Sequence, residues 1–274
     1  MLTQAEKGRA FAELHKRAGT FIIPNPWDVG SARLLTQLGF EALATSSAGY
    51  AFSIGKSDNA VGRDAMLAHA TEVAAATDLP VSIDLENGFG DAPEVVAQTI
   101  VRAAATGAAG GSIEDATERS DDPIYEPSLA VARIRAAAEA VRDLPFPFTL
   151  TARCENYLVG RPDVKDTIER LQMYQEAGAD VLYAPGVTTK EDIAAVVSSV
   201  DRPVNVLMGL KGVDLTLAEL SEIRVKRISV GSALARYALT ALLRGALEMK
   251  EHGTFRFADD AEPFRTINSL FAID

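Results

Sequence analysis

The stretch VSIDLENGFGD, residues 81–91, joins a buried-strand pattern to two acidic side chains. The apolar run ends in Asp84 and Glu86, and the chain then turns at Gly88 and Gly90. An unpaired charge at the end of a buried strand is unfavourable, so the pattern predicts a partner for these carboxylates. Because Asp84 and Glu86 are two residues apart, an extended strand would point both to the same side.

Short strand-like runs alternate with longer helical runs along the whole chain, which is typical of a parallel sheet with crossover helices. The eight predicted strands begin at Phe21, Glu41, Val81, Gly110, Phe148, Val181, Val204 and Arg227. Three of the predicted helices end in a glycine shortly before a strand, at Gly39, Gly107 and Gly178. This recurrence, with a length of 274 residues, favours a closed (β/α)₈ TIM barrel over an open doubly wound sheet.

No linker or low-complexity segment divides the chain. We therefore predict a single (β/α)₈ barrel domain over residues 1–274. An additional C-terminal helical tail is expected from about residue 251, after the eighth helix of the barrel.

The composition argues against several classes of protein. With 27 Lys and Arg against 38 Asp and Glu, the net charge is −11, which disfavours nucleic acid or an anionic membrane as partner. Cys154 is the one cysteine, so no intrachain disulfide can form, and no apolar run approaches the ~20 residues of a membrane span. The N-terminal stretch has an amphipathic helical pattern without a signal-peptide core. We expect a soluble, cytoplasmic protein.

A barrel carries its active site at the carboxyl ends of its strands. The polar residues expected at those ends are Asn25, Asp28, Thr45, Ser46, Ser47, Asp84, Glu86, Glu114, Asp115, Arg153, Glu155, Tyr183, Asn205, Ser229 and Ser232. The three histidines lie on or near helices, which disfavours a histidine-based metal site or triad.

Asp84, Glu86 and Glu114 would repel one another on adjacent strands unless a cation lay among them. Hard carboxylate oxygens suit Mg²⁺ or Mn²⁺, which keep several bound waters. The sequence therefore predicts a divalent metal as the partner of these acids. Ion pairs with Arg153 and nearby lysines are the alternative.

Arg153 is suited to hold a carboxylate or phosphonate by a two-point contact, and a structural ion pair with Glu155 or Glu114 is the competing interpretation. Asp58 lies in a polar loop, where it is either a general base or a solvated side chain. Cys154 should face the helices as a packing residue if Arg153 faces the barrel mouth.

Ser46 and Ser47 follow the second predicted strand. They either donate hydrogen bonds to an anionic group or serve as ordinary turn residues. Position alone does not separate these two interpretations.

Four stretches of the chain together resemble the isocitrate lyase and phosphoenolpyruvate (PEP) mutase superfamily. They are NPWDVGSARLLTQLGFEALATSSAG (25–49), SIDLENGFGD (82–91), GGSIEDA (110–116) and LTARCENYLVGRPD (150–163). The family's Asp-x-Asp-x-Gly-aromatic-Gly motif falls on residues 84–90, with Glu86 in place of the second aspartate. Its Glu-Asp strand end falls on Glu114 and Asp115, its substrate-binding arginine on Arg153 and its loop aspartate on Asp58.

The resemblance implies a (β/α)₈ barrel with Mg²⁺ (or Mn²⁺) held by the acidic residues largely through water. Members of this family cleave or form a C–C or C–P bond next to a carboxylate through an enolate. The resemblance also implies a homo-oligomer, a dimer or tetramer, whose last helix is exchanged between subunits.

From the strand ends and this resemblance together we expect a specific set of site residues. The expected metal ligands are Asp84, Glu86 and Glu114, the catalytic residues Asp58, Glu86 and Arg153, and the substrate-binding residues Ser46, Ser47, Ala48, Arg153 and Asn205.

The loop after the fourth predicted strand, ATERSDDPIYEPS (116–128), departs from the family pattern. It lacks the cysteine and histidine of the isocitrate and methylisocitrate lyases, and the lysine, threonine and asparagine of the phosphonate enzymes. Leu43 and Ala44 also stand where the phosphonate enzymes carry an aromatic residue, and the family's serine-glycine pair reads Ser46-Ser47. Both lyase chemistry on isocitrate and phosphoryl migration lose support.

We therefore expect an Mg²⁺-dependent lyase that cleaves a C–C bond of a small 2-oxo or 2-hydroxy di- or tricarboxylic acid such as oxaloacetate. Decarboxylation or a retro-aldol step would leave an enolate. A phosphonopyruvate- or PEP-type mutase or hydrolase is the first alternative. A non-catalytic 2-oxo acid binder and a barrel that binds a sugar phosphate at Gly231 and Ser232 are the others.

Overall fold

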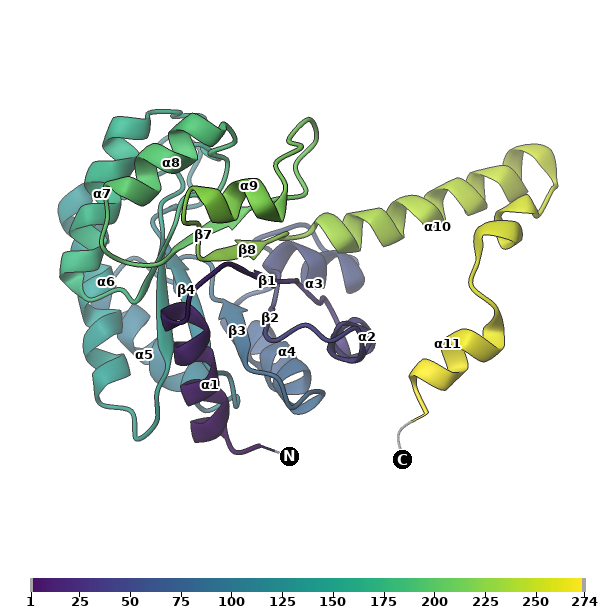
Figure 1. Cartoon of the computed structure of the whole chain (residues 1–274), viewed down its shortest axis with the longest axis horizontal. Helices are drawn as coiled ribbons and strands as arrows, with labels where there is room; N and C mark the ends of the chain where they lie inside the picture. Colours follow the sequence, from purple (N-terminus) through teal and green to yellow (C-terminus); the bar gives the residue numbers. More distant parts are fainter. Residues whose placement is uncertain (1, 273–274) are drawn as a thin grey trace.

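The computed structural model describes residues 2–272. Eight parallel strands form one sheet in the order β1-β8-β7-β6-β5-β4-β3-β2, which rolls into a nearly closed barrel (Figure 1). The strands are β1 (Phe21–Ile23), β2 (Leu43–Ala44), β3 (Val81–Asp84), β4 (Gly110–Glu114), β5 (Thr149–Arg153), β6 (Val181–Tyr183), β7 (Val204–Leu207) and β8 (Arg227–Ser229). Six begin at the predicted residue, and β2 and β5 begin two and one residues later. The predicted TIM barrel is confirmed.

Helices alternate with the strands, and those before α10 surround the barrel (Figure 1). They are α1 (Gln4–Lys16), α2 (Val29–Gln37), α3 (Ser47–Ser53), α4 (Arg63–Ala75), α5 (Pro93–Ala104), α6 (Pro127–Arg142), α7 (Val164–Ala177), α8 (Lys190–Ser198), α9 (Leu217–Glu222), α10 (Ala233–His252), the 3₁₀ helix η1 (Arg256–Asp260) and α11 (Phe264–Leu270). Gly178 ends α7 in the left-handed conformation, with φ of 111°, as its sequence position predicts. No described helix is both long enough and apolar enough to cross a membrane.

Asn25 closes the barrel between β1 and β2, the two ends of the sheet order. Its side-chain oxygen accepts hydrogen bonds from the backbone N–H groups of Val230 (2.9 Å) and Gly231 (3.0 Å), after β8. Its amide nitrogen donates to the carbonyl of Thr45, after β2, at 3.1 Å. The backbone N–H of Ala44 also donates to the carbonyl of Pro24 at 3.1 Å, so β1 and β2 are joined although they stand at opposite ends of the sheet order.

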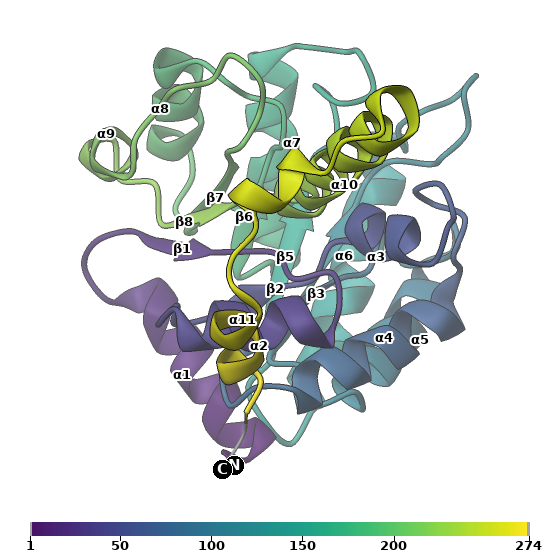
Figure 2. The ribbon, with the colours of Figure 1, turned by 90° about the vertical axis from the view of Figure 1, so that its right-hand side faces the viewer.

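The C-terminal arm, residues 233–272, departs from the usual barrel plan. The eighth helix, α10, does not lie along the barrel but projects away from it, and η1 and α11 follow at its far end (Figure 1). Large apolar side chains on the arm are exposed, among them Tyr237 (77%), Leu242 (66%) and Phe264 (84%). The last helix, α11, returns to α2 (Figure 2), where Gln37 donates a hydrogen bond to the carbonyl of Leu270. The leucine pattern of α10 therefore has no barrel surface to cover.

Replacing Asn25 with alanine should lower the free energy of unfolding by about 2–4 kcal/mol, because one buried and two partly buried backbone groups lose their partner. Urea denaturation followed by circular dichroism measures this change. The exposed Asn268→Ala serves as the control and should shift stability by less than about 0.5 kcal/mol. Equal stability of Asn25→Ala and the wild type would contradict the closure role.

Candidate active site

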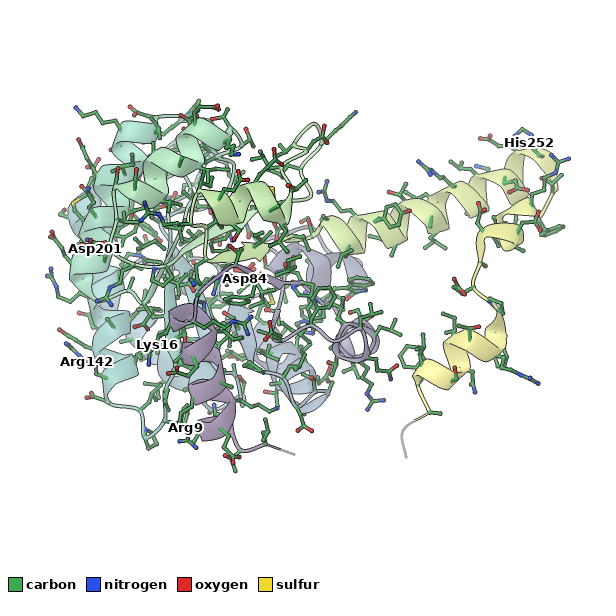
Figure 3. The ribbon with its side chains drawn as sticks, in the orientation of Figure 1. Arg9, Lys16, Asp84, Arg142, Asp201 and His252 are labelled. Atoms are coloured by element: carbon green, nitrogen blue, oxygen red, sulfur yellow. The ribbon has the colours of Figure 1, made fainter. Side chains whose placement is uncertain are left out.

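Three neighbouring strands end in the charged side chains of the barrel mouth. Asp84 is the last residue of β3, Glu114 of β4 and Arg153 of β5. Glu114 and Arg153 are direct partners in the β4–β5 ladder, so they lie side by side and face the barrel interior. Figure 3 shows Asp84 at the centre of the barrel, far from His252 at the tip of α10.

Arg153 connects the acidic residues of the mouth. Its guanidinium lies 3.1 Å from Glu114 and 3.8 Å from Asp84, and its Nε donates a hydrogen bond to Glu155. Burial lowers the pKa of Arg153, but the surrounding carboxylates raise it well above its ordinary value. Burial raises the pKa of Glu114 well above its ordinary value, Arg153 opposes this rise, and the neighbouring acids add to it. One cation therefore balances at least three carboxylates.

The segment after β2 forms the wall opposite Arg153. Ser46 caps the short helix α3 and accepts a hydrogen bond from Gly49 N–H. The Ser47 hydroxyl donates to Asp84 Oδ2 at 3.0 Å, and the backbone N–H of Ser47 lies 3.3 Å from the same oxygen. The sequence predicted turn residues or hydrogen-bond donors to an anionic group here. In the structure Ser47 donates to the Asp84 carboxylate and Ser46 caps α3, while the predicted contact of either serine with substrate stays a prediction.

The position of Glu86 differs from the one predicted from the sequence. The strand β3 ends at Asp84, and Glu86 lies in a turn with a φ of +50°, so strand alternation does not place it. Leu85 is buried in the core, as expected. The Glu86 side chain is only 3% exposed, and its Oε1 atom has no hydrogen-bond partner. Burial, followed by Asp84 and other nearby acids, raises the pKa of Glu86 to about 8.

The donor set of the mouth fits a divalent metal that keeps much of its water. Within residues 2–272, no three acidic, histidine or cysteine side chains stand close enough to form a ready-made metal cage. Mg²⁺ does not need such a cage, because it binds through one or two carboxylates and several waters. The buried, unpartnered oxygen of Glu86 and the surplus of acids around Arg153 are what a hard cation would satisfy. Asp84, Glu86 and Glu114 are the residues that would hold it.

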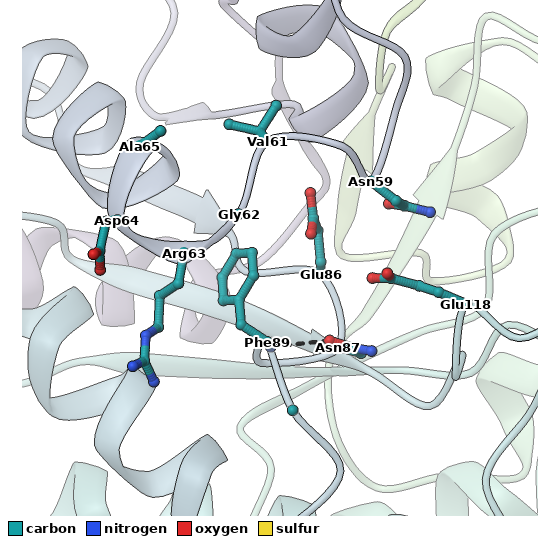
Figure 4. A pocket seen from close by; sticks show the side chains of 11 residues that line it. Asn59, Val61, Gly62, Arg63, Asp64, Ala65, Glu86, Asn87, Phe89 and Glu118 are labelled. Atoms are coloured by element: carbon teal, nitrogen blue, oxygen red, sulfur yellow. Dashed lines mark hydrogen bonds between the residues drawn. The ribbon is translucent and has the colours of Figure 1, made fainter.

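Two cavities open at the mouth and share Asn59 and Glu118 in their walls. One, of about 580 Å³, is lined by residues that include Ser47, Asp58, Glu114 and Arg153. The other, of about 750 Å³, holds Glu86 and Glu118, which point into it from two different loops (Figure 4). Burial and the nearby Asp84 raise the pKa of Asp58 above its ordinary value. The predicted loop aspartate therefore reaches the site.

Other expected residues lie deeper or elsewhere. Asn205 lines a smaller cavity of about 60 Å³ beneath the mouth, together with Asp84 and Arg153. Ala48 is half-buried in the first turn of α3 and lines none of these three cavities. Because the N–H of Gly231 donates to Asn25, it is not free to bind a sugar phosphate.

Asp115 faces away from the mouth. It accepts hydrogen bonds from the backbone of Glu155 at 2.7 Å and from Tyr174, and it pairs with Arg170 at 3.3 Å. Cys154 is buried beside this network, on the helix side, as expected. These residues hold the strand ends in place from the helix side, outside the site at the barrel mouth.

Glu118 was not predicted as a site residue from the sequence. Glu118 has a φ of +63° in the loop after β4, and burial and the charge of Asp58 raise its pKa. Its position in the loop that directly follows the Glu114–Asp115 strand end was the available signal. Tyr183, whose ring centroid lies 5.4 Å from Arg153 Cζ, was noted at a strand end but given no role.

Comparison with known proteins identifies the family of this chain. The family model described as phosphoenolpyruvate phosphomutase matches residues 11–250. The chain belongs to the isocitrate lyase/PEP mutase superfamily. A structure from Burkholderia cenocepacia J2315, provisionally named a lyase/mutase, is 62% identical, with a TM-score of 0.96 and coverage of 98% of this chain and 97% of that one.

Two proteins similar to this chain are named for a reaction of oxaloacetate. An oxaloacetate decarboxylase of Paraburkholderia xenovorans (strain LB400) is 29% identical over 263 residues, covering 93% of this chain and 85% of that protein. The structure of an oxaloacetate acetylhydrolase in complex with the product oxalate is 26% identical, with a TM-score of 0.85 and coverage of 98% and 93%. The superfamily thus includes enzymes with different reactions.

Without metal, Glu86 should make the protein less stable as the pH rises. Its folded-state pKa of about 8 exceeds the ordinary value of 4.5, so the folded protein holds a proton that the unfolded chain releases between these values. Stability is therefore lost across pH 4.5–8. In EDTA at pH 8, the free energy of unfolding of Glu86→Gln should exceed that of the wild type by at least about 1 kcal/mol.

Urea denaturation at pH 5 and pH 8 measures this difference, which should be much smaller at pH 5. The exposed Glu72→Gln is the matched control and should leave stability unchanged at both values. A Glu86→Gln variant less stable than the wild type at pH 8 would show that Glu86 is charged and well paired.

Proposed function

We propose that the protein is an Mg²⁺-dependent lyase that cleaves a C–C bond of a small 2-oxo or 2-hydroxy acid, with oxaloacetate as the first candidate. The observation that carries this proposal is the excess of acids around Arg153, with a buried Glu86 oxygen that lacks a partner. Two relatives named for reactions of oxaloacetate support the choice of substrate.

Arg153 has the central role among the chain's own residues. Its guanidinium would hold the substrate carboxylate and would stabilise the negative charge that grows on the enolate oxygen. A Mg²⁺ ion held by the nearby acids would withdraw electrons from the 2-oxo acid. Glu114 and Glu155 keep Arg153 in place through contacts that do not require the substrate.

Asp58 and Glu86 are the candidates for proton transfer. Burial raises the pKa of both carboxyls, to about 8 for Glu86, and so favours the protonated form of each. Asp58 lines the same cavity as Arg153, and Glu86 lines the adjacent one. Glu86 would be ionised while it holds the metal, so during turnover the Asp58 carboxyl would supply the proton that forms the product.

The loop formed by residues 116–127 would shield the reaction from water. Its base is closed by a bridge between Ala116 and Ile124, and Arg119 ties it to Asp91 at 2.9 Å. Tyr125 donates a hydrogen bond to the same Asp91 at 2.6 Å. The loop is thus attached to the turn that carries Glu86, and its closure and the shape of the site are coupled.

Incubation of the protein with a panel of 2-oxo and 2-hydroxy acids, with and without Mg²⁺, tests the reaction. We expect Mg²⁺-dependent cleavage of oxaloacetate or a related acid, followed by ¹³C and ³¹P NMR, and its loss in Asp84→Ala. A protein-free sample with Mg²⁺ controls for spontaneous decarboxylation, and phosphonopyruvate is included. Release of phosphate or formation of PEP, with every C–C bond intact, would assign the protein to the C–P branch instead.

We also propose that the protein is a homo-oligomer in which the C-terminal arm packs against a second copy. The arm exposes Leu242 (66%), Leu243 (62%) and Leu247 (49%) on α10, and Phe255 (66%) beyond it. Apolar surface of this extent marks an interaction site in a soluble protein. Exchange of an identical arm between copies is a simple way to cover it.

Size-exclusion chromatography with light scattering tests the assembly. The wild type should be a dimer or tetramer, and the double variant Leu242→Glu/Leu243→Glu should shift to smaller species. Val101→Glu, at a 53% exposed position on α5, is the control and should leave the mass unchanged. A monomeric wild type would refute the exchanged arm.

A further inference from the structure

A continuous run of polar side chains crosses the interior of the barrel. The ladder partners along strands β4 to β8 are Glu114, Arg153, Tyr183, Asn205 and Arg227, in that order. Direct partners in a parallel sheet face the same side, so all five project inward. The first three end their strands at the mouth, whereas Arg227 begins β8. The run therefore descends from the active site toward the opposite end of the barrel.

Arg227 lies in the barrel without an acidic partner. Its side chain donates to Asn205 Oδ1 at 2.9 Å and to Thr151 Oγ1 at 3.1 Å, and Nη1 lies 3.4 Å from His15 Nε2. The residue is 4% exposed, and none of its three partners is charged. A buried charge without a counter-ion is costly. Packing alone gives no reason to keep an arginine at this position.

The donors and acceptors between Arg227, Asn205 and Ser229 can be assigned. Arg227 Nε can only donate, so Asn205 must present its oxygen to it and its NH₂ group to Ser229 Oγ, 2.9 Å away. Ser229 Oγ accepts that bond and keeps its own hydrogen to donate. Ser229 and Tyr183 line the same 60 Å³ cavity beneath the mouth, which brings the hydroxyl and the phenol together.

Tyr183 lies between these hydrogen-bonded residues and Arg153. Its ring stands beside Arg153, with 5.4 Å between the ring centroid and the guanidinium carbon, and both residues line the 60 Å³ cavity with Asp84. Burial raises the pKa of Tyr183 to about 12, although Arg153 and Ser229 oppose the rise. The phenol is therefore neutral. Because Ser229 can donate to its oxygen, its own O–H is free to donate elsewhere.

We propose that Tyr183 is a catalytic residue whose phenol O–H donates a hydrogen bond to the anionic oxygen of the bound acid that Arg153 also contacts. Asn205, Ser229 and Arg227 are positioning residues that orient and polarise the phenol. The inference rests on the proposed function, because it assumes that an acid occupies the mouth. A second donor aimed at the same oxygen would share the charge of the enolate with Arg153.

Binding of oxalate, a planar dianion that resembles an enolate beside a carboxylate, tests the donor directly. Isothermal titration calorimetry with Mg²⁺ present should show an affinity about 10- to 100-fold weaker for Tyr183→Phe than for the wild type. The ring and its packing remain in this variant. Tyr174→Phe removes another buried phenol hydroxyl, on the helix side, and should leave the oxalate affinity unchanged.

Equal oxalate affinity of Tyr183→Phe and the wild type, within twofold, would overturn the proposal. A loss of affinity in Tyr183→Phe without turnover of any acid would support the donor and refute the proposed reaction. Failure of the wild type to bind oxalate at all would overturn both.

A double-mutant cycle tests the positioning chain. Ser229→Ala should weaken oxalate binding in the wild-type background but have no further effect in Tyr183→Phe, since both substitutions act through one hydrogen bond. On the natural substrate, Tyr183→Phe should lower kcat by about 10²-fold with little change in KM. Additive losses in the cycle would assign Ser229 a merely structural role.

Discussion

The guanidinium of Arg153 forms ion pairs with carboxylates from three strand ends, and the arrangement of the barrel mouth follows from this contact. Glu114 and Glu155 are too buried to exchange these pairs for water without a large cost. The mouth still contains more acid than one arginine can balance. That surplus is the physical reason to place a divalent cation and an anionic substrate together at this site.

The fold followed from the sequence because strand and helix periods are local properties. Asp84, Glu114 and Arg153 were expected at strand ends, and the structure has them there. The direction of α10 could not be predicted, because an apolar helix pattern does not say which surface covers it. In this fold the covering surface is not the chain's own barrel, as the exposed Leu242 shows.

The parts of the site that sequence reasoning missed depend on contacts between distant strands. Glu86 was placed by strand alternation, but the strand ends two residues earlier and a left-handed turn sets its position. The link from Tyr183 to Arg227 depends on strand register around the barrel, which no local pattern reveals. Glu118 belongs to a loop whose path is set by ion pairs such as that of Arg119 with Asp91.

We propose that the acids around Arg153, together with the buried Glu86, form a site for one divalent cation. Titration with Mn²⁺, followed by electron paramagnetic resonance at pH 6.5 and pH 8.5, tests this proposal. We expect one Mn²⁺ per chain, displaced by Mg²⁺ and bound more tightly at pH 8.5, because Glu86 must lose its proton. No stoichiometric binding at either pH would contradict it.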